Sequence, residues 1–263
     1  MKIGIVAESL NLPLRTVLTQ AAQWGVSGLQ LNATGDVAPE RLTETGRREF
    51  RHRLRSYSLE VSALYCPLRS GFDVPERLTE RIDRLKEAMT LSYDLGAKIV
   101  VVQAGGVPTD VNSPAGKLMM ESLTALGQYG DRIGAILALE SGLDSGEKLN
   151  EFLNRFDSGS IAVNYDPANM LIHGYDPVGN LLPLKGKIVH THARDARPSA
   201  VSRAASEVAL GAGHIDWMLY TATLEAMEYR GYLAVERETS ENRLADVEAG
   251  VKFLRRFIPP TQS

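Results

Sequence analysis

The sequence is poor in cysteine and carries little excess charge of either sign. Its single cysteine, Cys66, excludes an intrachain disulfide and any cysteine-based zinc cluster. The formal net charge is −3 over 263 residues, and the basic residues are spread along the chain, so no basic surface for nucleic acid is expected. We therefore expect a small-molecule partner and no nucleic acid.

Long apolar runs and phosphate-binding glycine motifs are also missing. No run approaches the roughly 20 apolar residues that span a bilayer, and the first residues lack the apolar core of a signal peptide. No Gly-x-Gly-x-x-Gly follows the first apolar run, and no Walker sequence occurs. We expect a cytoplasmic protein without a membrane partner, and a homo-oligomer stays open.

Eight short apolar runs alternate with segments of helical spacing. The runs are nearly continuous in Val, Ile and Leu, which is typical of parallel strands buried on both faces. Eight strand–helix units favour an α/β fold with a single (β/α)8 TIM barrel over 1–263, and a doubly wound open sheet is the alternative. The expected strands are 2–7, 28–31, 59–65, 98–103, 134–140, 161–166, 187–192 and 232–236. The expected helices are 14–24, 39–57, 75–95, 114–129, 146–156, 215–229 and 244–257, with a turn-rich segment at 167–183 and a long irregular loop at 193–214.

Four of the expected strands end in a residue that can bind a metal ion. The carboxyl ends of barrel strands share one rim, so these side chains should stand side by side. Capping of the next helix or a salt bridge is the structural alternative for each, but three carboxylates together would repel one another without a cation. The set suits one divalent ion, Mn²⁺, Mg²⁺, Co²⁺ or Zn²⁺. Its members are Glu140, Asp166, His192 and Glu236.

Further polar residues are candidates for contact with the substrate or the ligands. His190 shares a strand face with His192, and counting back by two from the ligands places His190 and Asn164 just beneath the ion. At the opposite half of the rim, the ends of earlier strands supply Glu8, Asn32 and Gln103.

The long loop 193–214 supplies a second group of candidates. Loops of that length in compact domains are usually functional. His214 follows a Gly-x-Gly turn and suits a gate or a substrate contact. Arg194, Arg197 and Arg203 could hold an anionic group of a substrate.

Five motifs that contain these residues follow one another along the chain. They are LESG at 139–142, NYDPANM at 164–170, HTHARD at 190–195, LGAGHIDW at 210–217 and AVERE at 234–238. With them the chain resembles the xylose-isomerase-like TIM barrels, a superfamily of sugar isomerases and epimerases that also includes inosose dehydratases and endonuclease IV. The resemblance runs through the whole chain in strand order.

The resemblance implies roles for particular residues. Glu140, Asp166, His192 and Glu236 would be the metal ligands, and Glu140 and Glu236 would also move the proton, as in the ketose 3-epimerases. Those epimerases carry a histidine three residues after the ligand aspartate, where this chain has Asn169. Asn169 can hydrogen-bond a substrate hydroxyl but cannot act as an acid. The arginine that follows the ligand histidine in those enzymes falls around 197–198.

Three classes of function follow from these expectations. The first is a metal-dependent isomerase or epimerase of a sugar or sugar phosphate, acting by proton transfer next to a carbonyl. Its alternative on the same scaffold is a lyase, an inosose or dehydroshikimate-type dehydratase. A repair enzyme resembling endonuclease IV would need several zinc ions and a basic groove, which five histidines and a charge of −3 disfavour. The third class is a metal-free binding barrel.

Overall fold

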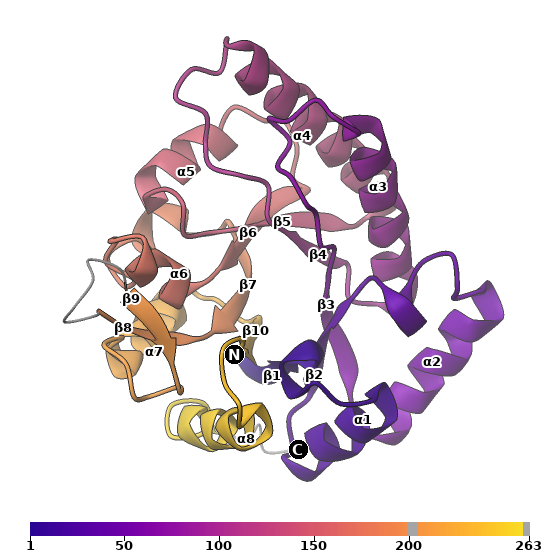
Figure 1. Cartoon of the computed structure of the whole chain (residues 1–263), viewed down its shortest axis with the longest axis vertical. Coiled ribbons are helices and arrows are strands. Elements are labelled where there is room, and N and C mark those ends of the chain that lie inside the picture. Colours follow the sequence, from indigo (N-terminus) through magenta and orange to yellow (C-terminus); the bar gives the residue numbers. More distant parts are fainter. Residues whose placement is uncertain (199–204, 260–263) are drawn as a thin grey trace.

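A computed structural model describes residues 1–198 and 205–259 of the chain. Eight parallel strands close into a barrel with helices around it, in the order β1-β10-β7-β6-β5-β4-β3-β2 (Figure 1), which confirms the predicted (β/α)8 barrel. The barrel strands are β1 (Lys2–Val6), β2 (Gly28–Asn32), β3 (Glu60–Tyr65), β4 (Ile99–Val102), β5 (Ile136–Glu140), β6 (Ile161–Tyr165), β7 (Ile188–Ala193) and β10 (Tyr232–Val235).

The helices lie outside the barrel and cover the outward faces of its strands. Leucine, valine and alanine side chains fill the layer between the strands and the helices, because alternate strand residues point outward. No helix in the described part of the chain is long and apolar enough to cross a membrane. The helices are α1 (Leu14–Gln23), α2 (Glu44–Ser56), α3 (Leu78–Leu95), α4 (Pro114–Ile133), α5 (Gly146–Leu153), α6 (Pro167–Ile172), α7 (Trp217–Ala226) and α8 (Arg243–Leu254).

The amino end of the barrel is closed by a tyrosine that two glycines accommodate. A Cβ on Gly28 would lie 2.3 Å from Cε1 of Tyr232, and a Cβ on Gly4 would lie 3.2 Å from its Cδ1. The Tyr232 hydroxyl meets the carboxylate of Glu60 at the same end. The polar strand ends lie at the opposite rim, at the carboxyl ends of the strands.

Several expected boundaries are wrong for reasons of local backbone chemistry. Helix α2 begins at Glu44, not near residue 39, because Thr43 caps it by accepting from the Gly46 N–H at 3.2 Å. Helix α3 begins at Leu78, not at residue 75, because Arg77 has a left-handed backbone with φ of 53°. The segment expected to be turn-rich contains α6, which Asp166 caps.

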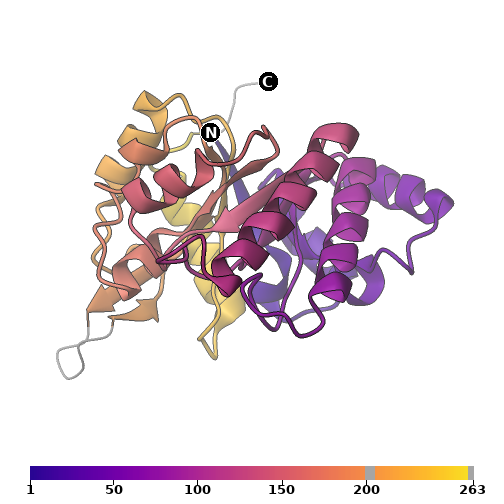
Figure 2. The ribbon, with the colours of Figure 1, turned by 90° about the horizontal axis from the view of Figure 1, so that it is seen from above.

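The loop expected to be irregular contains a β-hairpin. Strands β8 (Asp195–Pro198) and β9 (Ala205–Val208) pair antiparallel, with Asp195 opposite Val208. Figure 2 shows the N-terminus at one end of the barrel and this hairpin at the other. The hairpin therefore stands beside the rim that carries the polar strand ends.

Candidate active site

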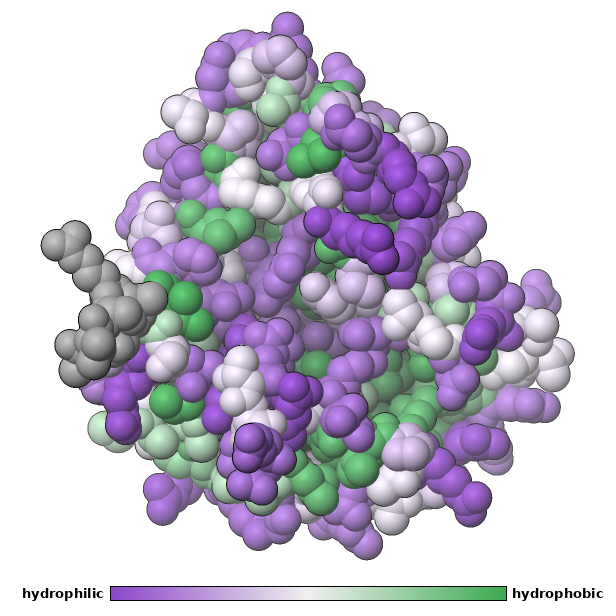
Figure 3. Space-filling model, in the orientation of Figure 1, coloured by the Kyte–Doolittle hydropathy of each residue, from purple (hydrophilic) through white to green (hydrophobic). Residues whose placement is uncertain are grey.

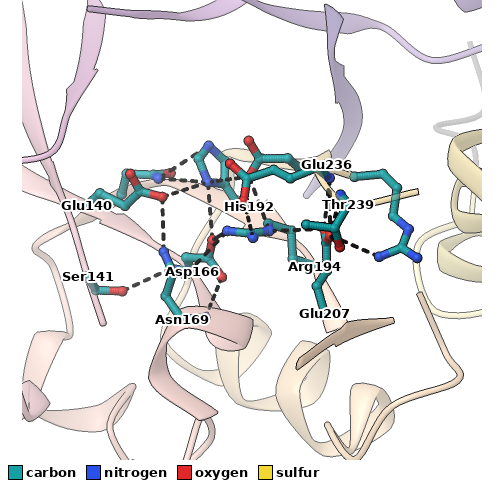
Figure 4. A network of polar contacts seen from close by, with 12 residues as sticks. Glu140, Ser141, Asp166, Asn169, His192, Arg194, Glu207, Glu236 and Thr239 are labelled. Carbon is teal, nitrogen blue, oxygen red and sulfur yellow. Dashed lines mark hydrogen bonds and ion pairs between the residues drawn. The ribbon is translucent and has the colours of Figure 1, made fainter. Parts of the chain in front are cut away.

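The four predicted ligands meet at the carboxyl ends of β5, β6, β7 and β10. Nδ1 of His192 lies 3.4 Å from Oε1 of Glu140, 3.5 Å from Oδ2 of Asp166 and 3.0 Å from Oε2 of Glu236. The four side chains are between 0% and 12% exposed. Figure 4 shows Glu140 and Glu236 on opposite sides of His192, with Asp166 between them and below.

Local structure aims each group at the centre of the set. Glu140 is the last residue of β5, and Asp166 directly follows β6. Oδ1 of Asp166 accepts from the Asn169 N–H at 2.9 Å as the cap of α6, which leaves Oδ2 facing His192. Helix capping, the alternative role considered for Asp166, therefore occupies its Oδ1. Its Oδ2 remains available as a metal ligand.

A single divalent ion fits this donor set. One ligand atom each from Glu140, Asp166 and His192 lies within 4.8 Å of the others, so the three residues can hold a metal ion. Oε2 of Glu236 is buried and receives no hydrogen bond from the described residues. This oxygen lies 3.0 Å from Nδ1 of His192, so a protonated imidazole or a metal ion in the same place would supply the positive charge that it lacks.

The pKa directions show the same demand for positive charge. Burial raises the pKa of Glu236 to about 7, although His192 and Arg194 act in the opposite direction. Burial would lower the pKa of His192, but Glu236, Asp166 and Glu140 hold it well above its usual value. Burial would raise the pKa of Asp166, but Arg194 and His192 hold it far below its usual range. The positive charges of Arg194 and His192 thus outweigh burial at Asp166 but not at Glu236.

A layer of buried polar residues supports His192 from beneath. Oε1 of Gln30 lies 2.9 Å from Nε2 of His192 and, being an acceptor only, takes its N–H, which leaves Nδ1 for the carboxylates or a metal. Nδ2 of Asn164 lies 3.3 Å from Nδ1 of His192, and Oδ1 of Asn164 lies 2.9 Å from Nδ1 of His190. A register shift between Val163 and Asn164 brings Asn164 opposite His190.

This layer corrects one expectation and adds one residue. His190 was expected to contact substrate, but it is fully buried beneath the ligands and bonded to Asn164 and to Oγ of Ser62. Gln30 was missed. The signal for it was present, because a glutamine within the apolar run of β2 has no other reason to be buried.

A cavity of about 310 Å³ lies over the predicted ligands. The candidate substrate residues from the opposite half of the rim line it. Glu8, Asn32 and Gln103 lie on its wall. Oε1 of Glu8 accepts from the Asn32 N–H at 2.6 Å. Asn169 donates from Nδ2 to Oε1 of Glu140 at 3.2 Å. These groups offer hydroxyl-binding donors and acceptors around the ligands.

Two residues of the long loop lie apart from this cavity. His214 is exposed, is not among the described residues that line the cavity, and donates its backbone N–H to the Ala196 oxygen at 2.9 Å. Arg197 donates to the backbone oxygen of Ala212. Arg203 falls outside the described residues.

Arg194 is not free to bind an anionic substrate group. Its guanidinium is 6% exposed and is surrounded by carboxylates. Nη1 donates to Oδ2 of Asp166 at 2.8 Å, Nη2 donates to Oε2 of Glu238 at 2.6 Å, and Nε lies 3.4 Å from Oε1 of Glu207. Arg194 therefore joins a predicted ligand to the β8–β9 hairpin and to the loop that follows β10.

Glu207, on β9, fastens that loop and was not predicted. Its carboxylate accepts from the backbone N–H groups of Glu238 at 3.0 Å and Thr239 at 2.8 Å, and from the Thr239 hydroxyl at 2.5 Å. Its side chain is 4% exposed and lies 2.9 Å from Nη1 of Arg237. The loop so held begins at Glu236, so the hairpin positions a predicted ligand. Nothing in the sequence of an apparently irregular loop pointed to this residue.

With the fold and site in place, the comparisons define the family. The chain belongs to the xylose isomerase-like TIM barrels, whose family profile matches residues 18–257. It is 26% identical to the uncharacterized protein YfiH of Bacillus subtilis (strain 168), over 98% of this chain and 99% of that protein. It is 21% identical to an inosose dehydratase of Geobacillus thermodenitrificans (strain NG80-2), over 64% of this chain and 67% of that enzyme.

Solved structures share the same barrel. A xylose isomerase domain protein from Planctomyces limnophilus superposes with a TM-score of 0.85 at 23% identity, covering 98% of both chains. The 3-keto-D-glucoside 4-epimerase YcjR of E. coli superposes with a TM-score of 0.77 at 18% identity, covering 97% of this chain and 99% of that one. At these identities the likeness shows the fold alone.

Replacing Glu207 by Gln should destabilise the protein, because the N–H, O–H and guanidinium groups that face this carboxylate would lose the negative charge they surround. We expect Glu207→Gln to lower the free energy of unfolding at pH 7 by about 2–4 kcal/mol in urea denaturation. The matched control, Glu248→Gln, changes a carboxylate that is 39% exposed and paired with Lys252, and it should alter the free energy by less than about 0.5 kcal/mol.

The effect of Glu207→Gln should depend on pH in a defined direction. The pKa of Glu207 lies below its usual value of 4.5: burial opposes this shift, but bonds from Thr239 and Glu238 and the charge of Arg194 outweigh it. The ionised Glu207 carboxylate therefore contributes fully to the free energy of unfolding above pH 4.5. This contribution is lost as the pH falls through the lowered pKa of Glu207. Equal unfolding free energies for Glu207→Gln and Glu248→Gln at pH 7 would contradict the positioning role.

Proposed function

We propose that this chain is a divalent-metal-dependent isomerase or epimerase of a sugar or sugar derivative. The observation that carries the proposal is the pair of buried glutamates, Glu140 and Glu236, that flank His192 at the floor of a hydroxyl-binding cavity. Inversion at a carbon requires one group to remove a proton from one face and another to return it from the opposite face. Two carboxylates on opposite sides of the bound sugar provide that arrangement.

The electrostatics favour proton transfer at Glu236. Burial raises the pKa of the Glu236 carboxyl above its ordinary value, which makes it a stronger base than an exposed glutamate, whereas a bound divalent ion would favour its ionised form. Glu140 receives the Asn169 amide at 3.2 Å, which fixes the direction of its carboxylate. A divalent ion held by Glu140, Asp166, His192 and Glu236 would act as a Lewis acid toward a carbonyl oxygen, which lowers the barrier to removal of the neighbouring proton.

The charges around the cavity favour an uncharged, hydroxyl-rich substrate. Glu8, Glu140, Glu236 and Glu238 all line it. Arg237, the arginine next to Glu236, is already paired with Glu207 and Asp246. Arg243 also lines the cavity, so a phosphate would meet four glutamates and two arginines, of which Arg237 is already paired, whereas sugar hydroxyls can donate to the carboxylates.

The second candidate function is a dehydratase on the same site, and the inosose dehydratase relatives favour it. Both reactions begin with removal of a proton next to a carbonyl. Elimination then needs an acid at the departing hydroxyl, a role that Asn169 cannot fill and that the protonated form of Glu236 can. The site is less suited to a multi-zinc nuclease, because the described residues contain one group of metal-binding side chains.

Metal binding should follow the geometry of the site. After treatment with EDTA, calorimetric titration with Mn²⁺ should show one ion bound per chain. A thermal melt of the Mn²⁺-loaded protein should show a higher melting temperature than that of the metal-free protein. Asp166→Asn and His192→Asn should each weaken the affinity at least about tenfold. Asp36→Asn is the control, since this carboxylate is 87% exposed and outside the site. Unchanged affinity in both site variants would rule out this set of ligands.

Replacement of either glutamate by Gln should separate catalysis from metal binding. Wild-type protein with Mn²⁺ in D₂O is screened by NMR against sugars, sugar phosphates and sugar acids for exchange of carbon-bound hydrogen. Glu140→Gln and Glu236→Gln should slow this exchange roughly 10²- to 10⁴-fold, whereas Glu241→Gln, at an exposed glutamate, should not.

The same samples distinguish the competing explanations. Metal occupancy is measured on each variant at saturating Mn²⁺, so that loss of the ion is not mistaken for loss of the base. A product of unchanged formula indicates epimerisation or isomerisation, and loss of water indicates the dehydratase. Parental exchange rates in both metal-loaded variants would disprove the proton-transfer role.

A further inference from the structure

A second cavity of about 320 Å³ adjoins the one above the predicted ligands. Gln103 and Glu140 line both, so the two spaces meet beside a predicted proton-transferring residue. Figure 3 shows this face of the molecule hollowed over the barrel mouth, with hydrophilic residues around the hollow. The other lining residues come from the β3–α3, β4–α4 and β5–α5 loops and from the region of α6. They include Leu68, Arg69, Ser70, Ala104, Leu143 and His173.

Close backbone approaches fix the walls of this second cavity. A Cβ on Gly71 would lie 2.6 Å from the Ala104 oxygen, and the adjacent Phe72, fully buried, donates its N–H to that oxygen at 3.1 Å. A Cβ on Gly142, whose φ is 133°, would lie 2.5 Å from Cβ of Asn169. Glycine at both positions lets neighbouring loops pack tightly, so the cavity is a preformed part of the rim.

The lining is mixed in a way that suits a ring. Leu68, Ala104 and Leu143 offer apolar surface, and Leu143 is 53% exposed although it faces the rim. Ser70, His173 and the charged Arg69 offer polar groups beside them. Rings that present an apolar face and a polar edge match such a surface, as aromatic groups and sugar rings both do.

We propose that the second cavity is a subsite for a second ring, carried through a glycosidic oxygen by the sugar that reacts between Glu140 and Glu236. The substrates are then glycosides rather than free monosaccharides. The inference rests on the proposed function for the position of the reacting sugar. A single sugar ring fills the cavity over the ligands, and a substituent that passes Glu140 and Gln103 enters the second one.

Calorimetric titration at saturating Mn²⁺ tests the subsite with paired probes. The first set compares D-fructose with its glucosides turanose, maltulose and isomaltulose, and the second compares D-glucose with phenyl β-D-glucopyranoside. The readout is the ratio of the Kd of the single-ring sugar to that of its two-ring partner. We expect a ratio of roughly ten or more in at least one set, the effect of burying about two methylene-sized apolar groups.

Variants that fill the second cavity test whether the tighter binding of the two-ring probes arises there. Leu143→Trp fills the cavity from an exposed position that tolerates substitution, and Ser70→Trp fills it from the opposite loop; either should reduce the ratio to about 1. Leu182→Trp, at a leucine that is 62% exposed and outside both cavities, should keep the wild-type ratio. A gain confined to the fructose glucosides identifies a second sugar ring, and a gain confined to the phenyl glucoside identifies an aromatic one.

Two results would overturn the subsite. One is a wild-type ratio near 1 in both sets, or no binding of any two-ring probe at its solubility limit. The other is a wild-type gain that both Trp variants in the cavity retain. Failure of the proposed function has a different signature, because it appears as absent hydrogen exchange whatever the ratio of affinities.

Discussion

The mutual repulsion of buried carboxylates around His192 is the constraint on which the rest of the site depends. Three acidic side chains face one imidazole nitrogen at 3.0–3.5 Å, largely out of contact with water, and this is stable only if positive charge faces them. Arg194 supplies part of that charge at Asp166 and is itself fixed by Glu207 and Glu238. The hairpin β8–β9 carries Glu207, which contacts both Arg194 and the loop that begins at Glu236, and so links the acid cluster to this part of the rim.

The barrel and its four meeting side chains could be predicted because they depend on rules that act along one strand at a time. An apolar run that ends in a carboxylate or imidazole predicts a buried strand, and it predicts that the terminal side chain lies at the rim of the barrel. The apolar run of β2 marked Gln30 as unusual, but its role comes from a contact with His192, 162 positions away. Glu207 could not be found in this way, since its importance comes from contacts with a loop 31 positions away in the chain. Alternation along β7 placed His190 beneath the ligands correctly, but it could not show that Asn164 and Ser62 seal the imidazole from the substrate.

Within this family the barrel is shared by relatives with different printed activities, so the fold alone does not set the reaction. In this chain three features lie around the ligand cluster: Asn169 beside Glu140, the acidic lining above the ligands, and the second cavity behind Gln103. In the proposed reaction Glu140 and Glu236 move the proton, because Asn169 cannot act as an acid. In the proposed subsite the second cavity receives a second ring.

We propose that Glu140, Asp166, His192 and Glu236 together hold one divalent ion. Anomalous diffraction from crystals grown with Mn²⁺, recorded at the manganese absorption edge, locates such an ion. We expect one strong anomalous peak per chain, within bonding distance of Nδ1 of His192 and of an oxygen from each of the three carboxylates. A peak elsewhere on the chain, or none between these residues while Mn²⁺ is present in excess, would contradict it.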